Sequence, residues 1–366
     1  MAQSIYYLII AILLFDYLLE RLLDYLNSTR WSNELPAALQ GIYDAEKYRK
    51  AQDYERTKTR FSILTSTFSL TAMLLLLFLG GFAWLDNLVR AYTTNPILMA
   101  LFFFGALGFA ADLLTTPFSV YSTFVIEEKF GFNKTTPRTF ILDKLKGWIL
   151  SLVIGGGLVA LVVWIYIGTG DWFWLLAWAV MGVFIVFMTM FYAHLIVPLF
   201  NKQTPLEEGE LRTSIEQFAR KVQFRLTNIF VMDGSKRSTK ANAYFTGLGA
   251  KKRIVLFDTL INDQTTEELV AVLAHEVGHY KKKHTLTSTI LSLLQVGLML
   301  YILGLFIGVP DLSMALGAEE GSFHVGVLAF GLLYSPLSLI LGLIMNYISR
   351  KNEYAADRYA GEKFNP

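Results

Sequence analysis

The sequence predicts a mainly α-helical, polytopic membrane protein with a small α+β region on its cytosolic side. Three observations support this fold class. Of the 366 residues, 54% are hydrophobic and only 17% are charged, whereas an average globular protein has about 45–50% apolar and about 25% charged residues. Seven segments reach the length of about 20 mostly apolar residues that one helical span requires. Lys and Arg are concentrated in every second loop between those segments.

The seven predicted spans differ in how clearly the sequence marks them. The first is the weakest, because Asp16 interrupts it and its length depends on including Glu20 and Arg21. We include it because it completes the topology. The predicted spans run roughly from Ile5 to Leu23, Phe61 to Leu85, Ile97 to Val120, Trp148 to Ile167, Phe173 to Pro198, Leu286 to Val309 and Val325 to Ile348.

The distribution of basic residues predicts the orientation, because Lys and Arg accumulate in cytoplasmic loops. All of the 32 basic residues except Arg21 and Arg90 fall in four segments, residues 25–60, 121–147, 199–285 and 349–366. We therefore expect the N-terminus outside and the C-terminus in the cytosol. No basic residue precedes the first apolar run, which indicates a retained first span, with residue 1 as the start of the mature protein.

Composition also excludes several kinds of site. The chain has no cysteine, so it cannot use disulfides, thiolate metal ligands or a cysteine nucleophile, and any metal must be held by His, Asp or Glu. The formal net charge of +2 is small, and no basic stripe interleaved with aromatic residues follows the chain. We therefore expect no nucleic-acid partner.

The long cytosolic segment, residues 199–285, has the pattern of a small folded unit. Apolar residues at helical spacing predict a helix over 211–222, and β-branched and aromatic residues predict strands at 228–233 and 253–258. The run NAYFTGLGAKK, residues 242–252, has the turn residues of a hairpin. Thr265 followed by Glu268 predicts a capping box at the start of a helix that carries the run HEVGH.

The HEVGH run predicts a zinc-peptidase site. On a helix, His275 and His279 project from one face, as two ligands of one metal ion must, and Glu276 lies beside them, where it can act as general base on a water bound to the metal. The alternative is an ordinary exposed helix that happens to carry two histidines and a glutamate.

A catalytic zinc site needs a third protein ligand, with the fourth position left to water. The other histidines are poor candidates. We take His284 to follow three lysines on the same helix, His324 to belong to the opposite side of the membrane, and His194 to lie inside the fifth span. A carboxylate is therefore expected.

The hairpin of the last two spans favours Glu353 as that carboxylate. Its loop, residues 310–324, is expected outside, so the chain returns to the cytosolic face close to the HEVGH helix. Asp357, one helical turn after Glu353, is expected to accept the free N–H of a ligand imidazole. The alternative for Glu353 is an ordinary surface carboxylate. With one Zn²⁺ per chain to polarise a peptide carbonyl and Glu276 to move the proton, the predicted reaction is peptide-bond hydrolysis.

HEVGH in a chain of seven predicted spans, with SRKNEYAAD (349–357) after the last, resembles the type I CAAX prenyl endopeptidases, integral-membrane zinc metallopeptidases of the gluzincin type. The resemblance extends over nearly the whole chain. It includes EEKFGFNKTTPRTF (127–140), PLFNKQTPLEEGEL (198–211), GSKRSTKANAYFTG (234–247) and KKRIVLFDTL (251–260).

This resemblance implies a set of roles for residues of this chain. His275, His279 and Glu353 would bind zinc, and Glu276 would be the general base. Asn242 and Ala243 would lie on an edge strand that pairs with the substrate backbone. The seven helices would enclose a chamber with the zinc site at its cytosolic end, and the substrate would have a prenylated CAAX C-terminus. The family also has a His and an Arg beyond its ligand helix, for which the sequence up to Pro366 has no match. Either the sequence is part of a longer chain or the activity is lower, and we expect zinc binding to stay intact in both cases.

The predicted organisation has four parts. Residues 1–198 hold the first five spans, residues 199–285 the cytosolic metallopeptidase core, residues 286–348 the last two spans, and residues 349–366 the helix of the third ligand. The expected location is a bacterial inner membrane or the endoplasmic reticulum membrane of a eukaryote. Two other functions stay open: a broader zinc endopeptidase for membrane-protein quality control, and a seven-span transporter or receptor without proteolysis.

Overall fold

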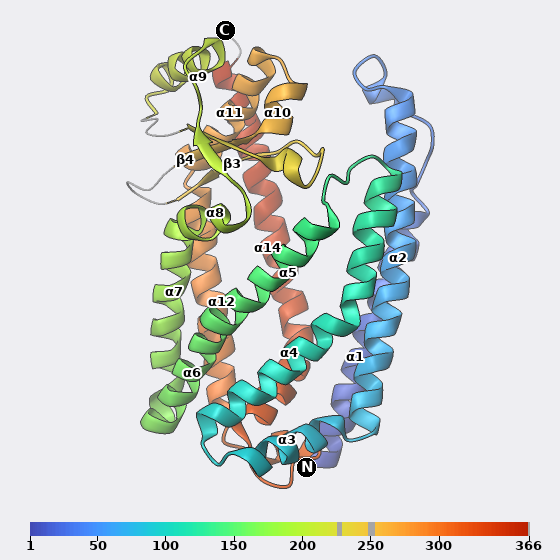
Figure 1. The fold of residues 1–366 in the computed structure, drawn as a ribbon, viewed down its shortest axis with the longest axis vertical. Helices are drawn as coiled ribbons and strands as arrows, with labels where there is room; N and C mark the ends of the chain where they lie inside the picture. Colours follow the sequence, from blue (N-terminus) through green and yellow to red (C-terminus); the bar gives the residue numbers. More distant parts are fainter. Residues whose placement is uncertain (225–228, 248–252, 365–366) are drawn as a thin grey trace. The chain divides into compact units, whose positions relative to one another are not determined.

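The computed structural model describes residues 1–224, 229–247 and 253–364, and within these ranges the chain is mainly helical (Figure 1). The two longest α-helices in these ranges are α2 with 34 residues and α14 with 42. The α-helices are α1 (Ala2–Ser28), α2 (Ala45–Phe78), α3 (Gly81–Tyr92), α4 (Pro96–Tyr121), α5 (Pro137–Leu150), α6 (Gly156–Thr169), α7 (Phe173–Leu195), α8 (Val197–Phe200), α9 (Glu210–Lys221), α10 (Asp258–Asp263), α11 (Thr266–Lys281), α12 (His284–Phe306), α13 (Pro310–Ala315) and α14 (Phe323–Phe364).

Shorter segments complete the secondary structure. Turns of 3₁₀ helix occupy Ala37–Leu39, Gly170–Trp172 and Gly234–Lys236. π-helical segments occupy Ser122–Glu127 and Ser151–Gly155. The strands are β1 (Gln203–Pro205), β2 (Ile229–Met232), β3 (Ala243–Thr246) and β4 (Arg253–Phe257).

Among the described residues, six candidate ranges are long and apolar enough to cross a bilayer, judged by length and composition. The fourth and fifth predicted spans fall together in one range of 64 residues, Pro137–Phe200, so the predicted count of seven is not confirmed. The six ranges are Ala2–Ser28, Ala45–Phe78, Pro96–Glu127, Pro137–Phe200, His284–Phe306 and Phe323–Phe364.

The predicted end of the second span at Leu85 is wrong. Helix α2 ends at Phe78, Gly80 adopts a left-handed conformation with φ of 66°, and α3 begins at Gly81. A glycine just after a helix commonly takes this conformation, because it has no Cβ to clash with the preceding turn. The residues assigned to the end of one span therefore begin a separate helix, and Phe82 and Leu85 are buried on it.

The chain divides into two compact units, each described here by itself. The first contains residues 1–131, 151–170 and 302–339. Its core joins helices α1 to α4 with α13 and the start of α14, through buried residues such as Ile9, Phe82, Phe103 and Val325.

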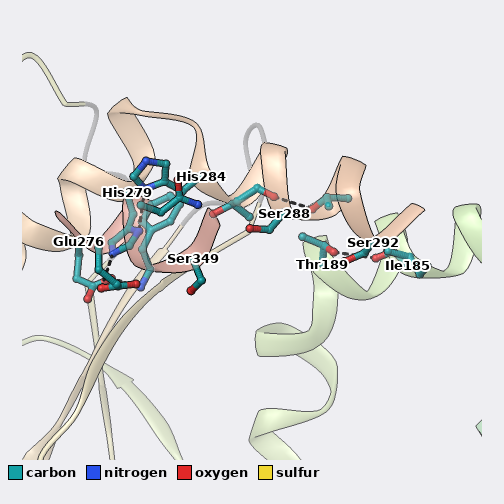
Figure 2. A pocket seen from close by; sticks show the side chains of 13 residues that line it. Ile185, Thr189, Glu276, His279, His284, Ser288, Ser292 and Ser349 are labelled. Atoms are coloured by element: carbon teal, nitrogen blue, oxygen red, sulfur yellow. Dashed lines mark hydrogen bonds and ion pairs between the residues drawn. The ribbon is translucent and has the colours of Figure 1, made fainter. Parts of the chain in front are cut away.

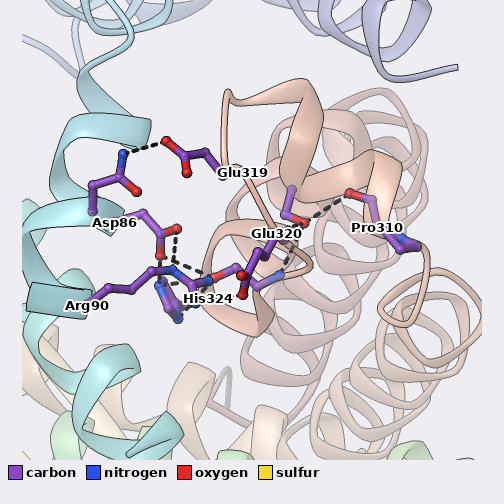
Figure 3. Close-up of polar contacts among 9 residues, drawn as sticks. Asp86, Arg90, Pro310, Glu319, Glu320 and His324 are labelled. Atoms are coloured by element: carbon purple, nitrogen blue, oxygen red, sulfur yellow. Dashed lines mark hydrogen bonds and ion pairs between the residues drawn. The ribbon is translucent and has the colours of Figure 1, made fainter. Parts of the chain in front are cut away.

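A buried ion-pair network lies in the first unit (Figure 3). The side chain of Asp86 on α3 is fully buried, and its carboxylate contacts His324 Nε2 at 2.6 Å and Arg90 Nε at 2.9 Å. Burial alone would raise the pKa of Asp86, but the hydrogen bonds from His324 and Arg90 outweigh burial and hold this pKa below its ordinary value. His324 is thus a structural partner of Asp86.

The second unit contains residues 132–150, 171–301 and 340–366 and holds a four-stranded sheet of order β1-β2-β4-β3. Strands β2 and β4 are parallel, and β3 pairs antiparallel with β4, so the predicted hairpin joins these two strands. Its turn residues 248–252 lie outside the described residues. The predicted strands and the predicted helix α9 are present.

Helices α9, α11 and the end of α14 pack with the sheet around one apolar core in the second unit. Ile215 of α9, Leu256 of β4 and Ala274 of α11 are all fully buried in it. This packing holds one face of α11 against the sheet. His275, Glu276 and His279 of the same helix lie outside this core and are only partly buried.

The predicted capping box at the start of α11 is confirmed. The Thr265 hydroxyl accepts from the backbone N–H of Glu268, and the Glu268 carboxylate accepts from the backbone N–H of Thr265. The expectation that His284 continues this helix is wrong. Helix α11 ends at Lys281, Lys283 has a φ of 60°, and His284 begins α12. Such a residue ends a right-handed helix, because its N–H and C=O no longer point along the helix axis.

Candidate metal centre

Two helices bring the predicted ligands together. Helix α11 carries His275, Glu276 and His279, and α14 carries Glu353 and, one turn later, Asp357. The three predicted ligands form the group in the described residues whose donor atoms could hold a metal ion, and these atoms lie within 4.8 Å of one another. Figure 2 shows Glu276 and His279 at the cavity next to this group.

A glycine lets the two helices approach closely. A Cβ placed on Gly278 of α11 would lie 3.1 Å from both the Cα and the carbonyl oxygen of Ala356 on α14. Ala356 is fully buried at this contact. The packing sets the spacing between the HEVGH run and Glu353, which lies three residues before Ala356 on the same helix.

The ligand distances match those around a tetrahedral zinc ion. With zinc–ligand bonds of about 2.0–2.1 Å, neighbouring ligand atoms in a tetrahedron lie about 3.3–3.4 Å apart. The Nε2 atoms of His275 and His279 are 3.0 Å apart, and Glu353 Oε2 lies 3.4 Å from His275 Nε2 and 3.6 Å from His279 Nε2. Two imidazoles and one carboxylate form a common ligand set for catalytic zinc. These residues therefore fit the ion.

Asp357 lies beside His275. Its Oδ1 is 2.8 Å from Nδ1 of His275, the ring nitrogen that faces away from the ligand group. A carboxylate in this position accepts the imidazole N–H and orients Nε2 toward the metal. Glu353 and Asp357 thus contact the two nitrogens of the same His275 ring.

Glu276 lies beside the ligand group and is partly buried. Burial raises the pKa of its carboxyl above the ordinary value, while His275 and a hydrogen bond from the backbone of Phe245 act in the opposite direction. The Phe245 N–H donates to Oε2 of Glu276 at 3.2 Å. A raised pKa suits a carboxylate that takes up a proton and later releases it near neutral pH.

Ala243 begins β3, which is an edge strand of the sheet, and Asn242 directly precedes this strand. The Asn242 carbonyl accepts from the N–H of Phe257 on β4 at 3.0 Å. Because backbone groups alternate in an antiparallel ladder, those of Ala243 and Phe245 are directed to the free edge. The hydrogen bond from Phe245 to Glu276 shows that this free edge faces the general-base candidate.

A cavity of about 490 Å³ adjoins the site (Figure 2). Glu276, His279 and Glu353 line one part of it, and hydroxyl side chains line another. These hydroxyls include Ser288 and Ser292 on α12, Ser349 on α14 and Thr189 on α7. The site therefore opens into a space with polar walls, although α7 and α12 are apolar helices.

Two contacts were missed from the sequence. His284 lies 3.0 Å from His279, ring nitrogen to ring nitrogen, and the Phe245 N–H contacts Glu276. The positive φ of Lys283, which brings His284 back to the site, has no signal in a run of three lysines. The Phe245 contact depends on strand register, which the spacing of apolar residues does not specify.

Comparison with known proteins gives a consistent result. A family model described as "CAAX prenyl protease N-terminal, five membrane helices" matches residues 24–202, and the model "Peptidase family M48" matches residues 205–365. The chain is 40% identical over 344 residues to "Probable CAAX prenyl protease 1" of Schizosaccharomyces pombe, covering 89% of this chain and 72% of that protein. It is 38% identical over 357 residues to "CAAX prenyl protease 1" of Saccharomyces cerevisiae, covering 89% and 78%.

A solved structure is similar over almost the whole chain. The crystal structure of S. mikatae Ste24p matches with a TM-score of 0.92 at 34% sequence identity, covering 98% of this chain and 88% of that one. The likeness includes both the helical segments and the sheet with its ligand helix, because so little of the chain is left unmatched. The chain therefore belongs to peptidase family M48, together with the CAAX prenyl proteases, and is a multi-pass integral membrane metalloprotease.

Proposed function

We propose that this chain is a zinc metalloendopeptidase that hydrolyses a peptide bond near the C-terminus of prenylated CAAX proteins. The observation that carries the proposal is the ligand triangle of His275, His279 and Glu353, with edges of 3.0, 3.4 and 3.6 Å, beside the carboxylate of Glu276. The substrate class comes from the names of the relatives, which are CAAX prenyl proteases.

In this proposal the three ligands hold one zinc ion per chain, which supplies positive charge to polarise the scissile carbonyl. Glu276 accepts a proton from the attacking water and delivers it to the leaving amine. Its hydrogen bond with the Phe245 N–H keeps the carboxylate oriented while it is unprotonated. Asp357 keeps the His275 ring in the orientation that presents Nε2.

The free edge of β3 is the proposed substrate-binding strand. An extended peptide that adds to this edge hydrogen-bonds through its main chain, whatever its side chains are. Ala243 would contribute backbone groups, whereas the Asn242 carbonyl is already paired with Phe257, so Asn242 would act through its side chain. This pairing would align the scissile bond with Glu276.

We also propose seven spans, an outside N-terminus and a cytosolic active site, in the endoplasmic reticulum membrane or a bacterial inner membrane. The range Pro137–Phe200 has 64 residues, and as one helix it would be about 96 Å long, about three times the hydrocarbon thickness. Gly170 has a φ of 51° between α6 and α7, where one crossing can end and the next begin. The four-part division at residues 198, 285 and 348 and the enclosed chamber stay predictions.

The test is cleavage of a farnesylated CAAX peptide and a matched unprenylated peptide by the purified protein, with products mapped by mass spectrometry. We expect cleavage of the farnesylated peptide, its loss on chelation, and its recovery on adding Zn²⁺. Cleavage that persists in the chelator, or in Glu276→Gln, would contradict the zinc mechanism. Equal cleavage of both peptides would favour the quality-control role. A failure to cleave either peptide with zinc bound would contradict the proposed substrate class.

A further inference from the structure

His284 contacts a ligand of the proposed zinc site from the side opposite the metal. Its Nδ1 lies 3.0 Å from Nδ1 of His279, and the two ring centroids are 5.0 Å apart with ring planes at 77°. Both side chains are largely buried, with His279 18% exposed and His284 9% exposed as a residue. His284 also lines the cavity beside Glu276 and Glu353 (Figure 2).

The ring nitrogens of His279 have different surroundings. Its Nε2 faces His275 Nε2 and Glu353 Oε2, so this nitrogen has to be unprotonated to act as a ligand. The proton of the neutral ring is then on Nδ1, and in this largely buried side chain it needs an acceptor. His284 Nδ1 is in position to be that acceptor, with its own proton on Nε2.

The same arrangement occurs at the other histidine ligand. Asp357 contacts Nδ1 of His275 at 2.8 Å, on the ring edge away from Glu353. Each ligand imidazole in the described structure therefore has its own partner at Nδ1, a carboxylate for His275 and an imidazole for His279. A ligand histidine usually has such a partner, because it selects the tautomer and the ring orientation.

Chain geometry explains how His284 reaches this position. On an unbroken helix, residues five apart are separated by about 140° around the axis, so His279 and His284 could not face each other. The backbone does not continue as one helix here, because Lys283 has a positive φ of 60° and α12 begins at His284. The break between the two helices thus turns His284 back toward His279.

Two other roles for His284 agree less well with the contacts. As a metal ligand it would have to approach the group at Nε2 of His279, but it contacts Nδ1 on the other side of the ring. If His284 only filled space, its Nδ1 would have no reason to lie 3.0 Å from Nδ1 of His279, and a leucine would pack equally well. The first alternative fails on geometry and the second is tested below.

We propose that His284 is a positioning residue, which accepts the Nδ1–H of His279 and so holds that ligand in the tautomer and orientation that zinc binding requires. The inference rests on the proposed zinc site and adds a residue that acts on it. Its role concerns the affinity and geometry of the metal site, and it makes no contact with the reacting atoms.

The test compares zinc affinity in wild type, His284→Leu and His284→Asn, measured by competition with a chromophoric chelator. Leu removes the acceptor at similar size, whereas the Asn side-chain oxygen can take the place of Nδ1. We expect His284→Leu to weaken zinc binding by about 10- to 100-fold, as is typical for such partners, and Asn to restore most of the loss. Absorption of the Co²⁺-loaded proteins should change in Leu and resemble wild type in Asn.

The outcomes separate this inference from the proposed function. Tight zinc binding by wild type with unchanged binding in His284→Leu, or equal losses in Leu and Asn, would overturn the role of His284 alone. Absence of stoichiometric zinc binding in wild type would overturn the proposed function together with it. Thermal unfolding of the metal-free variants reports any general loss of folding.

A measurement on wild type keeps the inference testable if His284→Leu does not fold. The chain has five histidines, so selective ¹⁵N-histidine labelling gives few ring signals. With zinc bound, we expect one histidine protonated at Nδ1 to share an N–H···N coupling with a second that is protonated at Nε2. The signal of the second should disappear in His284→Asn. Finding the His284 proton on Nδ1 would refute the assignment.

Discussion

Replacement of Gly278 by alanine tests whether the close approach of α11 and α14 sets the ligand geometry. The added Cβ would lie 3.1 Å from the Cα and the carbonyl oxygen of Ala356 and 3.3 Å from Cβ of Tyr359. Ordinary contacts of this kind begin at 3.4 Å, so the helices have to move apart by a few tenths of an ångström. Because Glu353 is on α14, it moves away from His275 and His279 with that helix.

The expected magnitude follows from two opposing effects. Overpacking of a well-packed contact costs about 1–3 kcal/mol, whereas replacing a helical glycine by alanine gains about 1 kcal/mol. The net loss in the free energy of unfolding is therefore about 0–2 kcal/mol. In the metal-free variant this strain is relieved when the three ligands move apart, and zinc binding has to restore it. A strain of about 1.4 kcal/mol therefore lowers zinc affinity about tenfold.

The assay is zinc affinity by chelator competition, together with thermal unfolding of the metal-free protein. Gly361→Ala is the control, because Gly361 is a helical glycine on α14, the helix that carries Glu353, and a Cβ there would meet no atom within 4 Å. We expect the control to keep wild-type zinc affinity and to be slightly more stable. Wild-type affinity in Gly278→Ala, with no loss of stability, would refute the idea that this contact sets the ligand spacing.

Three further predictions concern Glu276, Lys283 and Asp86. Glu276→Gln should keep zinc binding while peptide hydrolysis falls by about 100-fold or more, since it removes the proton acceptor; loss of bound zinc, measured by elemental analysis, would argue for a ligand role instead. Lys283→Gly should raise the free energy of unfolding by up to about 1 kcal/mol in thermal or denaturant unfolding, because glycine adopts the positive φ of this residue without a steric cost; a marked loss of stability would show that this strain is absent. The folded pKa of Asp86 lies below its ordinary value of 3.8, so its ion pairs stabilise the fold fully above about pH 4 and less as the pH falls through the folded pKa. Unfolding temperatures of Asp86→Asn should therefore be lower at neutral pH and less sensitive to acid than those of wild type, and parallel pH profiles would contradict this.

Local patterns in the sequence were sufficient for the ligand helix. The pair Thr265 and Glu268 marked its start, and the four-residue spacing of His275 and His279 placed both rings on one face. Glu353 was selected by a topological argument, from the hairpin of the last two predicted spans. That argument requires only that both segments reach the same region, so it indicated the residue without giving a distance.

The sequence could not reveal features that depend on backbone conformation or on contacts between distant segments. Lys283 and Gly80 have similar values of φ, 60° and 66°, but only the glycine is a residue type that commonly has this conformation. The sequence therefore did not reveal the break after Lys281. The resulting contact of His284 with His279 was missed for the same reason. The second span was predicted to end at Leu85, whereas α2 ends at Phe78, because the apolar composition continues through the turn into α3.

The sequence by itself determined the membrane class, the helix that carries the two histidines and the chemical kinds of ligand available, since these depend on composition and on spacing along one helix. Tertiary structure decided the distances of the ligand triangle, the partner of each imidazole and the strand edge that faces Glu276. These properties arise where α11 meets α14, α12 and β3, and such contacts depend on the fit between side chains from separate segments. The physical reason is that periodicity specifies which face of a helix a residue occupies, whereas close packing specifies what that face meets.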